Sequence, residues 1–194
     1  MKVLGLTGGV GMGKTTAAQM FTAAGTKVLD TDLLARQLVE PGQPALAEII
    51  ACFGSAFIDS LGRLRRLDLA RVVFADSSRR VQLEQILHPR IRAAWQQQIL
   101  DWRTSGERLG VVVIPLLFET QVESHFDRIL CAACLPDTQR TRLAARGWTA
   151  EQASQRIAAQ LPIEQKITRS QHVIWTEGCL ACTSRQIERI LGGM

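Results

Sequence analysis

The chain has 194 residues, a length that suits one compact domain with small insertions and argues against two large independent domains. Hydrophobic residues make up 46% and charged residues 21%, which excludes a disordered chain, a collagen-like repeat and a coiled coil. The net charge of +5 comes mostly from arginine, which favours bidentate contacts with phosphate and so suits nucleic acid, nucleotides or a phosphorylated metabolite.

The sequence predicts neither a membrane span nor a secretion signal. A membrane helix needs about 18 consecutive apolar residues, and no such window exists. Gly8 and Gly9 interrupt the apolar start of the chain before it reaches the roughly 7–15 residues of a signal-peptide core. We therefore expect a cytoplasmic protein.

The first segment predicts a βαβ unit. An apolar run at 2–7 predicts a strand, a glycine-rich turn follows, and apolar residues at helical spacing over 17–24 predict a helix that ends near Gly25. A second short strand is expected at 27–30. Strands joined in this way are parallel, and their crossover is right-handed.

A long helical segment is expected from Leu33 to about Trp102. Trp95 and Trp102 are seven residues apart on one helix face, so we expect them to pack in the core rather than stack on a ligand. Glycine and proline should interrupt the segment in four places. These places are 41–44, Gly54, Gly62 and Pro89.

Three further strands are expected at 110–114, 128–132 and 172–175, because each is a short apolar run. An arginine-rich helical stretch over 137–159 and a closing helix over 183–191 accompany them. Five strands that alternate with helices predict a three-layer α/β fold. Its centre is a doubly wound, parallel, five-stranded sheet like that of P-loop NTPases.

Residues 8–15 match the phosphate-binding pattern G-x-x-x-x-G-K-[ST]. A chance match in a chain of this composition has a probability of about 0.003. Glycines permit the positive φ angles that bring backbone N–H groups onto phosphate oxygens at a helix N-terminus. We expect Lys14 to bridge the β- and γ-phosphates and Thr15 to ligate Mg²⁺, with Thr16 as a further phosphate or capping contact.

This loop alone does not distinguish kinases from GTPases and motor ATPases. A GTPase of this length would carry an N-K-x-D motif, which is missing, and a motor would need a longer chain. A small-molecule kinase fits best, because it adds a helical acceptor-binding insert and an arginine-rich lid to this core. Within one domain, we expect the core at about 1–34, 108–136 and 170–194, the insert at about 35–107 and the lid at about 137–169.

Asp30 and Asp32 follow the second strand, at the sheet edge where doubly wound folds bind ligands. Asp32 is the candidate that orients or deprotonates an attacking hydroxyl group. Alternatively, it caps the helix that begins at Leu33, and the two roles are compatible.

Four segments together resemble the dephospho-CoA kinase family. They are Leu-Thr-Gly-Gly-Val-Gly-Met-Gly-Lys-Thr at 6–15, Asp-Thr-Asp-Leu-Leu-Ala-Arg at 30–36, Leu-His-Pro-Arg-Ile at 87–91 and Pro-Leu-Leu-Phe-Glu at 115–119. Single matching positions extend the resemblance over nearly the whole chain. They are Gly62, Leu64, Arg66, Gln139, Arg142, Arg146, Arg156, Ile157, Gln160 and Lys166.

The resemblance implies transfer of the γ-phosphoryl group of ATP to the ribose 3′-hydroxyl of dephospho-CoA, the last step of coenzyme A biosynthesis, with ATP and Mg²⁺ bound at the loop. It implies that Asp32 is the catalytic base, assisted by Lys14 and by the lid residues Arg142 and Arg146, which close over the γ-phosphate. The implied nucleotide-binding residues are Gly8, Gly9, Gly11, Met12, Gly13, Lys14, Thr15 and Thr16. The implied acceptor-binding residues are Asp32, Arg36, His88, Leu117 and Glu119.

Several of these residues have simpler alternatives. His88 precedes a proline and could end a helix, and Glu119 could cap a helix or lie on the surface. The arginines of 140–156 could form a solvated face, and Arg140 is off the matching positions. Thr176 stands where the family has an asparagine, in a loop expected near the adenine, so this departure should bear on nucleotide affinity or base selectivity.

Five cysteines are present, in two C-x-x-C pairs and one single residue. A four-thiolate zinc site is formally possible, but Cys131 and Cys134 lie in an expected strand, where positions three apart point to opposite faces. We therefore expect packed thiols rather than metal or redox chemistry.

Two other functions remain open from the sequence. Another small-molecule or nucleoside monophosphate kinase would keep Lys14, Thr15 and the lid but change the acceptor. A nucleic-acid-binding ATPase or an idle nucleotide-binding module would suit the basic charge, but no lysine-rich tract or aromatic stripe supports it. We expect no nucleic-acid or membrane partner, and the sequence leaves the oligomeric state open.

Overall fold

The computed structural model describes residues 1–194 apart from the side chain of Phe74. The chain forms two compact units. The first unit combines Met1–Asp30 with Asp101–Met194, and the second unit is Thr31–Leu100. The chain therefore leaves the first unit after the second strand and returns to it before the third.

The first unit contains a parallel sheet of five strands in the order β2-β3-β1-β4-β5. The central strand β1 (Lys2–Gly8) pairs with β3 (Leu109–Val113) on one side and β4 (Arg128–Ala133) on the other. The edge strands are β2 (Lys27–Asp30) and β5 (His172–Trp175). All five predicted strands are confirmed to within one residue at each end.

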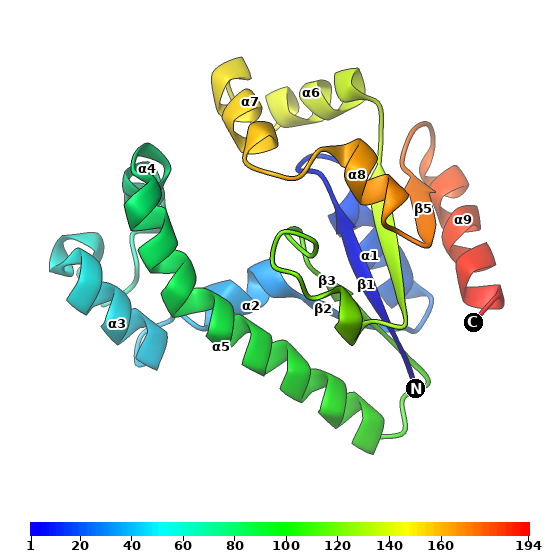
Figure 1. Cartoon of the computed structure of the whole chain (residues 1–194), viewed down its shortest axis with the longest axis horizontal. Helices are drawn as coiled ribbons and strands as arrows, with labels where there is room; N and C mark the ends of the chain where they lie inside the picture. Colours follow the sequence, from blue (N-terminus) through cyan, green and yellow to red (C-terminus); the bar gives the residue numbers. More distant parts are fainter. The chain divides into compact units, whose positions relative to one another are not determined.

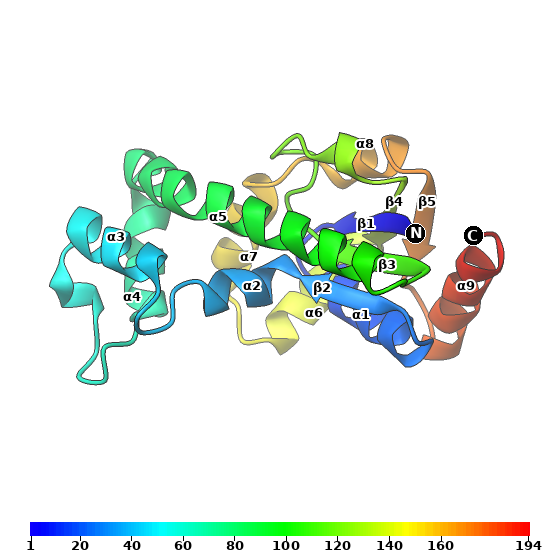
Figure 2. The ribbon, with the colours of Figure 1, turned by 90° about the horizontal axis from the view of Figure 1, so that it is seen from below.

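Helices cover both faces of this sheet and produce three layers (Figure 1, Figure 2). Helices α1 (Lys14–Ala23) and α9 (Leu180–Gly192) lie side by side on one face, and α8 (Ile163–Thr168) lies on the other. Helices α6 (Pro136–Ala145) and α7 (Ala150–Ala158) follow β4. The predicted fold class is therefore confirmed, although α9 begins earlier than expected and the 137–159 stretch is two helices.

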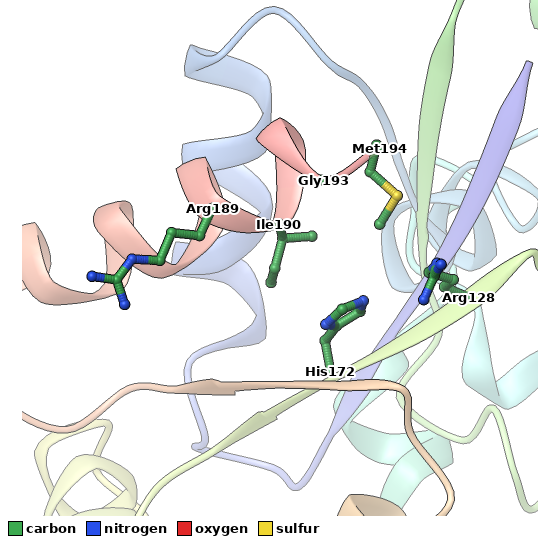
Figure 3. Close-up of a pocket in the computed structure, with 6 residues that line it drawn as sticks. All are labelled: Arg128, His172, Arg189, Ile190, Gly193 and Met194. Atoms are coloured by element: carbon green, nitrogen blue, oxygen red, sulfur yellow. The ribbon is translucent and has the colours of Figure 1, made fainter.

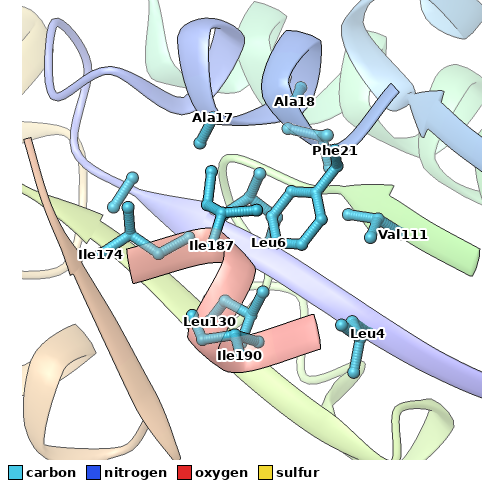
Figure 4. Packing of buried hydrophobic residues seen from close by; sticks show 12 residues of the cluster. Leu4, Leu6, Ala17, Ala18, Phe21, Val111, Leu130, Ile174, Ile187 and Ile190 are labelled. Carbon is cyan, nitrogen blue, oxygen red and sulfur yellow. The ribbon is translucent and has the colours of Figure 1, made fainter. Parts of the chain in front are cut away.

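The main core lies between the sheet and helices α1 and α9 (Figure 4). Phe21 on α1 and Leu6 on β1 are completely buried, and Ile187 on α9 is 2% exposed. Complete burial of one such side chain stabilises the fold by about 1.5–3 kcal/mol. The cluster consists of Leu4, Leu6, Ala17, Ala18, Phe21, Val111, Val113, Leu130, Ala132, Ile174, Ile187 and Ile190.

Trp102 packs directly against the backbone of β3. A Cβ on Gly110 would lie 2.5 Å from the Trp102 ring, so only glycine leaves room for the indole. Trp102 is 7% exposed, and Trp95 is 3% exposed. Both tryptophans are core residues, as predicted.

The second unit is helical and has a core of its own. Its cluster is formed by Val39, Ala45, Ile49, Leu69 and Val73. The helices of this unit are α2 (Thr31–Gln37), α3 (Pro44–Phe53), α4 (Arg66–Ala75) and most of α5 (Ser77–Thr104). A short 3₁₀ turn lies at Ser55–Phe57 in this unit, and another lies at Glu123–His125 in the first unit.

The expected break at Pro89 is wrong, because α5 continues through the proline. A proline within a helix removes one hydrogen bond and costs about 3 kcal/mol. Arg90 spans the affected turn: its guanidinium donates to the Ile86 carbonyl O at 2.6 Å and to Glu48 of α3 at 2.9 Å. The helix therefore continues through the proline although local propensity predicts an end.

The five cysteines are unpaired and differ in exposure. Cys131 and Cys134 are buried, and burial raises the pKa of the Cys131 thiol to about 11, so the prediction of packed thiols is confirmed for this pair. It is wrong for Cys52 and Cys179, which are exposed, and for Cys182, which is half-buried. These three lie in the last or first turn of a helix or directly before it. Of the helices described, none is both long enough and apolar enough to span a membrane.

Candidate active site

The glycine-rich loop joins β1 to α1 in the predicted way. Gly8 ends β1 with φ 142°, and Gly13 precedes α1 with φ 88°, which are conformations that favour glycine. A Cβ on Gly8 would lie 2.2 Å from the carbonyl O of Ala132, and one on Gly13 would lie 2.9 Å from Thr176. The loop thus sets the N-terminus of α1 at the end of the central strand, where backbone N–H groups and the helix dipole favour an anion.

The side chain of Lys14 lies against its own loop. Its Nζ atom donates to the carbonyl oxygens of Gly8 and Gly9, each at 2.9 Å. Phosphate oxygens are acceptors of the same kind with a higher negative charge. The ammonium group can therefore exchange these carbonyl oxygens for the oxygens of a bound phosphate.

The remaining loop residues divide into supporting and accessible positions. Gly9, Gly11 and Met12 are buried, so they shape the loop from within. Thr15 is exposed in the first turn of α1, where its hydroxyl is accessible, and Thr16 is half-buried beside it.

Two glutamine side chains hold the tip of the loop from a distance. The Val10 N–H donates to Oε1 of Gln160 at 2.9 Å, and the Val10 carbonyl O accepts from Nε2 of Gln139 at 2.7 Å. Gln139 belongs to α6, and Gln160 follows α7. The backbone of Val10 is thus fixed by the segment that the sequence predicts to be a lid.

Arg142 is held by the loop that follows β5. Its guanidinium donates to the Thr176 hydroxyl at 2.9 Å and to the Thr176 carbonyl O at 2.6 Å. The same hydroxyl oxygen lies 3.1 Å from the carbonyl O of Met12 and 3.2 Å from that of Ala133. Thr176 is 6% exposed. Through these contacts, the residue that departs from the family pattern connects Arg142 with the phosphate loop and β4.

Arg142 and Arg146 reach the same hollow as the phosphate loop. The hollow has a volume of about 190 Å³. Two guanidinium groups and a helix N-terminus make it suitable for an anion. It is lined by Gly11, Gly13, Thr16, Arg142, Arg146 and Thr176, together with three residues near the start of α9.

Arg140 differs from these two arginines. It forms an ion pair with Asp137 at 3.4 Å, and both side chains are mostly exposed. Exposed pairs of this kind contribute little to stability. Arg140 thus lies on a solvated face of α6.

Glu119 takes part in a buried ion pair. Its Oε1 atom lies 2.8 Å from Nζ of Lys166 and accepts from the Leu161 N–H at 2.8 Å. Lys166 is completely buried and also donates to the carbonyl O of Pro115 at 2.8 Å. Glu119 therefore does not lie free on the surface, and it fixes the segment between α7 and α8 to the segment after β3.

The second carboxylate oxygen of Glu119, Oε2, is buried and has no hydrogen-bond partner among the described residues. An unpaired buried acceptor costs about 1–3 kcal/mol. A hydroxyl or N–H group of a ligand, or a cation, would satisfy it. Leu117, two residues earlier, is completely buried against Gly5, so its side chain belongs to the core and only its backbone can face a ligand.

The other predicted acceptor residues belong to the second unit. Asp32 lies in the first turn of α2, which begins at Thr31, so it does not cap a helix beginning at Leu33. Arg36 lies in the last turn of α2, and its carbonyl O accepts from Arg66 at 3.0 Å. His88 lies within α5 and does not end a helix. The roles of Asp32, Arg36 and His88 in catalysis and acceptor binding stay predictions.

No group of three or more histidine, cysteine, aspartate or glutamate side chains among the described residues is arranged to hold a metal. The zinc alternative has no support in the described residues.

A second hollow, of about 320 Å³, lies at the other end of the sheet (Figure 3). Arg128 and His172, which line it, are the first residues of β4 and β5, and Arg189 and Ile190 come from the end of α9. Parallel sheets of this class bind their ligands at the carboxyl ends of the strands. This hollow is therefore not part of the candidate active site.

The supporting contacts were not predicted from the sequence. Gln139, Gln160 and Lys166 are positions of the family resemblance, but no role followed for them from the residues alone. Each acts on a partner more than 40 positions away along the chain. Only the folded arrangement reveals such contacts.

Comparison with known proteins gives concordant results. The family model described as dephospho-CoA kinase matches residues 2–181. A dephospho-CoA kinase of Bacillus cereus is 40% identical over 190 residues, which cover 97% of this chain and 95% of that protein.

Solved structures agree with this result. A protein from Thermus thermophilus superposes with a TM-score of 0.85 at 32% identity, covering 100% of this chain and 97% of that one. Dephospho-CoA kinase from Campylobacter jejuni superposes with a TM-score of 0.73 at 21% identity, covering 99% of this chain and 98% of that one. The second likeness is evidence of the shared fold.

Proposed function

This chain belongs to the dephospho-CoA kinase family and phosphorylates dephospho-CoA to coenzyme A, and we propose that its glycine-rich loop and the arginines of the segment after β4 carry out the transfer from ATP. The donor follows from the family, since a kinase uses ATP as the phosphate donor. The observation that carries the residue assignment is the position of Lys14, whose ammonium group lies on the loop carbonyls at the N-terminus of α1.

We assign the triphosphate to this loop. Lys14 leaves the carbonyl oxygens of Gly8 and Gly9 and binds the β- and γ-phosphates, while the N–H groups of the loop and of α1 bind phosphate oxygens. Gln139 and Gln160 hold Val10, which keeps the loop open for the phosphates. The tip of the loop is therefore fixed before the nucleotide arrives, and Lys14 is the part that moves.

Arg142 and Arg146 stabilise the charge that develops on the transferred group. Arg142 uses two of its five N–H donors on Thr176, and we propose that others contact the γ-phosphate. Thr176 thus orients a catalytic arginine, a role that its carbonyl and hydroxyl oxygens share. Phosphoryl transfer needs positioning and charge stabilisation more than covalent help from the protein.

We propose that Asp32 accepts the proton of the ribose 3′-hydroxyl and that Arg36 and His88 bind the acceptor. Glu119 provides an unpaired carboxylate oxygen for a donor group of the acceptor, and Lys166 holds that carboxylate in place. Leu117 contributes through its backbone, because its side chain is buried.

The residues present fit a Mg²⁺ ion. Thr15 is exposed in the first turn of α1, and a threonine hydroxyl is an oxygen ligand of the kind that Mg²⁺ takes. Thr15 would hold the ion together with phosphate oxygens and water. When bound, the ion neutralises charge on the β- and γ-phosphates.

We place the reaction in the cytoplasm, where ATP is available and unpaired cysteines such as the five of this chain persist.

The test is the rate of ADP release with ATP and Mg²⁺ in the presence of different acceptors. Dephospho-CoA is compared with adenosine, AMP, CMP and shikimate at equal concentrations. We expect turnover with dephospho-CoA to exceed that with each other acceptor by at least about 100-fold, because sites that hydrogen-bond their substrate reject analogues strongly.

Variants separate the residue assignment from the reaction. Lys14→Met removes the phosphate contact, and Arg140→Met serves as a matched control, since it also replaces a cationic side chain but one that is mostly exposed and paired with Asp137. Loss of activity in the first variant and normal activity in the second supports the assignment. Equal activity in both variants would contradict the residue assignment. In the acceptor comparison, turnover with another acceptor instead of dephospho-CoA would contradict the proposed acceptor.

A further inference from the structure

Two thiols lie in contact at the start of α9, outside the residues assigned to phosphoryl transfer. Cys179 precedes the helix and is exposed, and Cys182 lies in its first turn and is half-buried. Their sulfur atoms are 3.2 Å apart, and the Cys182 N–H donates to the Cys179 carbonyl O at 3.0 Å. Since a disulfide bond is about 2.05 Å long, the two side chains need only a small shift to form one.

The surroundings of Cys179 favour its thiolate. A hydrogen bond from the Cys182 thiol, followed by the backbone N–H of Cys182, lowers the pKa of the Cys179 thiol below its ordinary value. The N-terminus of a helix favours negative charge, and the Arg185 guanidinium lies 3.5 Å from the Cys182 sulfur. Because the thiolate is the attacking species in thiol–disulfide exchange, Cys179 is placed to react first.

Hydrogen bonds on both sides hold the two cysteines in position. Before Cys179, the Glu177 carboxylate accepts from the Leu135 N–H at 2.7 Å. Within α9, the Gln186 side chain accepts from the Trp175 N–H at 2.8 Å and donates to the Trp175 carbonyl O at 2.9 Å, which fixes the helix to β5. Folding has therefore already brought the two sulfur atoms together, and disulfide formation costs little further conformational entropy.

We propose that Cys179 and Cys182 form a redox-active dithiol, which a low-molecular-weight disulfide such as oxidised glutathione converts to an intramolecular disulfide. The Cys179 thiolate attacks one sulfur of the oxidant, whose S–S bond breaks, and the departing thiolate takes up a proton. Cys182 then loses its proton to solvent and attacks the Cys179 sulfur, which breaks the mixed disulfide and releases the second thiol. The dithiol loses two electrons, and the oxidant is reduced to two thiols.

The dithiol lies at the edge of the hollow that faces the phosphate loop. Gly178, Leu180 and Thr183 line this hollow, and each is a direct neighbour in the chain of one of the two cysteines. If the nucleotide binds there, as the proposed function states, it covers the approach to Cys179. The dithiol chemistry itself does not depend on the nucleotide.

The experiment treats the whole protein with mixtures of oxidised and reduced glutathione, stops the reaction with acid and digests it with trypsin. Cleavage after Arg169 and Arg185 releases residues 170–185 as one peptide that contains both thiols. We expect this peptide to lose two hydrogen atoms in mass, and we expect Cys179 to react about 10-fold faster than Cys52, an exposed cysteine without a neighbouring thiol. The proposal is overturned if the peptide keeps both thiol hydrogens in a large excess of oxidised glutathione, or if Cys52 reacts as fast.

Two variants test the order of attack. With Cys182→Ser, a mixed disulfide should accumulate on Cys179, whereas with Cys179→Ser little should accumulate. The reverse pattern would overturn the assignment of Cys179 as the attacking thiol. The unfolding midpoint of each variant verifies its fold. The peptide mass of the unaltered protein tests the dithiol independently of both variants.

Addition of ADP tests the position beside the nucleotide separately. We expect saturating ADP to slow the reaction of Cys179 several-fold and to leave that of Cys52 unchanged. Equal rates with and without ADP would overturn the placement beside the nucleotide, whereas a peptide that still loses two hydrogens would uphold the dithiol. The failure of the nucleotide assignment and the failure of the dithiol therefore give different results.

Discussion

Replacement of Lys166 by methionine tests the buried ion pair that joins the two segments around Glu119. The Lys166 side chain is completely buried, and it loses contacts to Glu119 and to the Pro115 carbonyl O, each at 2.8 Å. Removal of one partner of a buried pair costs about 3–5 kcal/mol. Because the Glu119 side chain keeps 21% of its surface exposed, water relieves part of the cost, and we expect about 3 kcal/mol.

The assay is urea unfolding of the unaltered chain, Lys166→Met, Glu119→Leu and the double variant, together with one control variant. The double variant should recover much of the loss, since no charge is then left unpaired. Arg140→Met is the matched control, because its pair with Asp137 is exposed and should contribute at most about 0.5 kcal/mol. A Lys166→Met protein as stable as the control, or fully additive losses in the double variant, would refute the reasoning.

Three further predictions concern the site and its supports. Asp32→Ala should lower kcat by orders of magnitude and keep ATP binding, and near-normal turnover would exclude a base or essential orienting role. Gly13→Ala should raise the KM for ATP, since φ 88° costs a residue with a Cβ about 1–2 kcal/mol and the Cβ meets Thr176; an unchanged KM would contradict this. Thr149→Ala removes the capping box with Gln152 at the start of α7 and should cost about 1 kcal/mol in urea unfolding, whereas Thr149→Ser should cost less; equal losses would show that the cap contributes nothing.

The sheet could be predicted because its signals are local. Each buried strand is a short apolar run. The glycine-rich motif predicts both the turn and the helix that follows it. The strands β2 and β5 lie at the predicted residues. The helical segments were less predictable, since α5 continues through Pro89, where local propensity predicts an end.

The site was predictable where a residue type is required by its own backbone or chemistry. Gly8 and Lys14 are of this kind. Thr176 and Lys166 are not, because their roles arise from long-range contacts with Arg142 and Glu119. The same holds for Cys179, whose exposure depends on the position of α9.

The product of the reaction tests the central assignment most directly. The protein is incubated with ATP, Mg²⁺ and dephospho-CoA, and the phosphorylated ribose carbon of the product is identified by phosphorus–proton NMR, with Lys14→Met as the comparison. We predict coenzyme A with its phosphate on the 3′-oxygen, and a rate at least about 100-fold lower for Lys14→Met, because a preorganised charge at the transferred group is removed. A phosphate on another oxygen, no product from the unaltered protein, or equal rates for the two proteins would contradict the assignment.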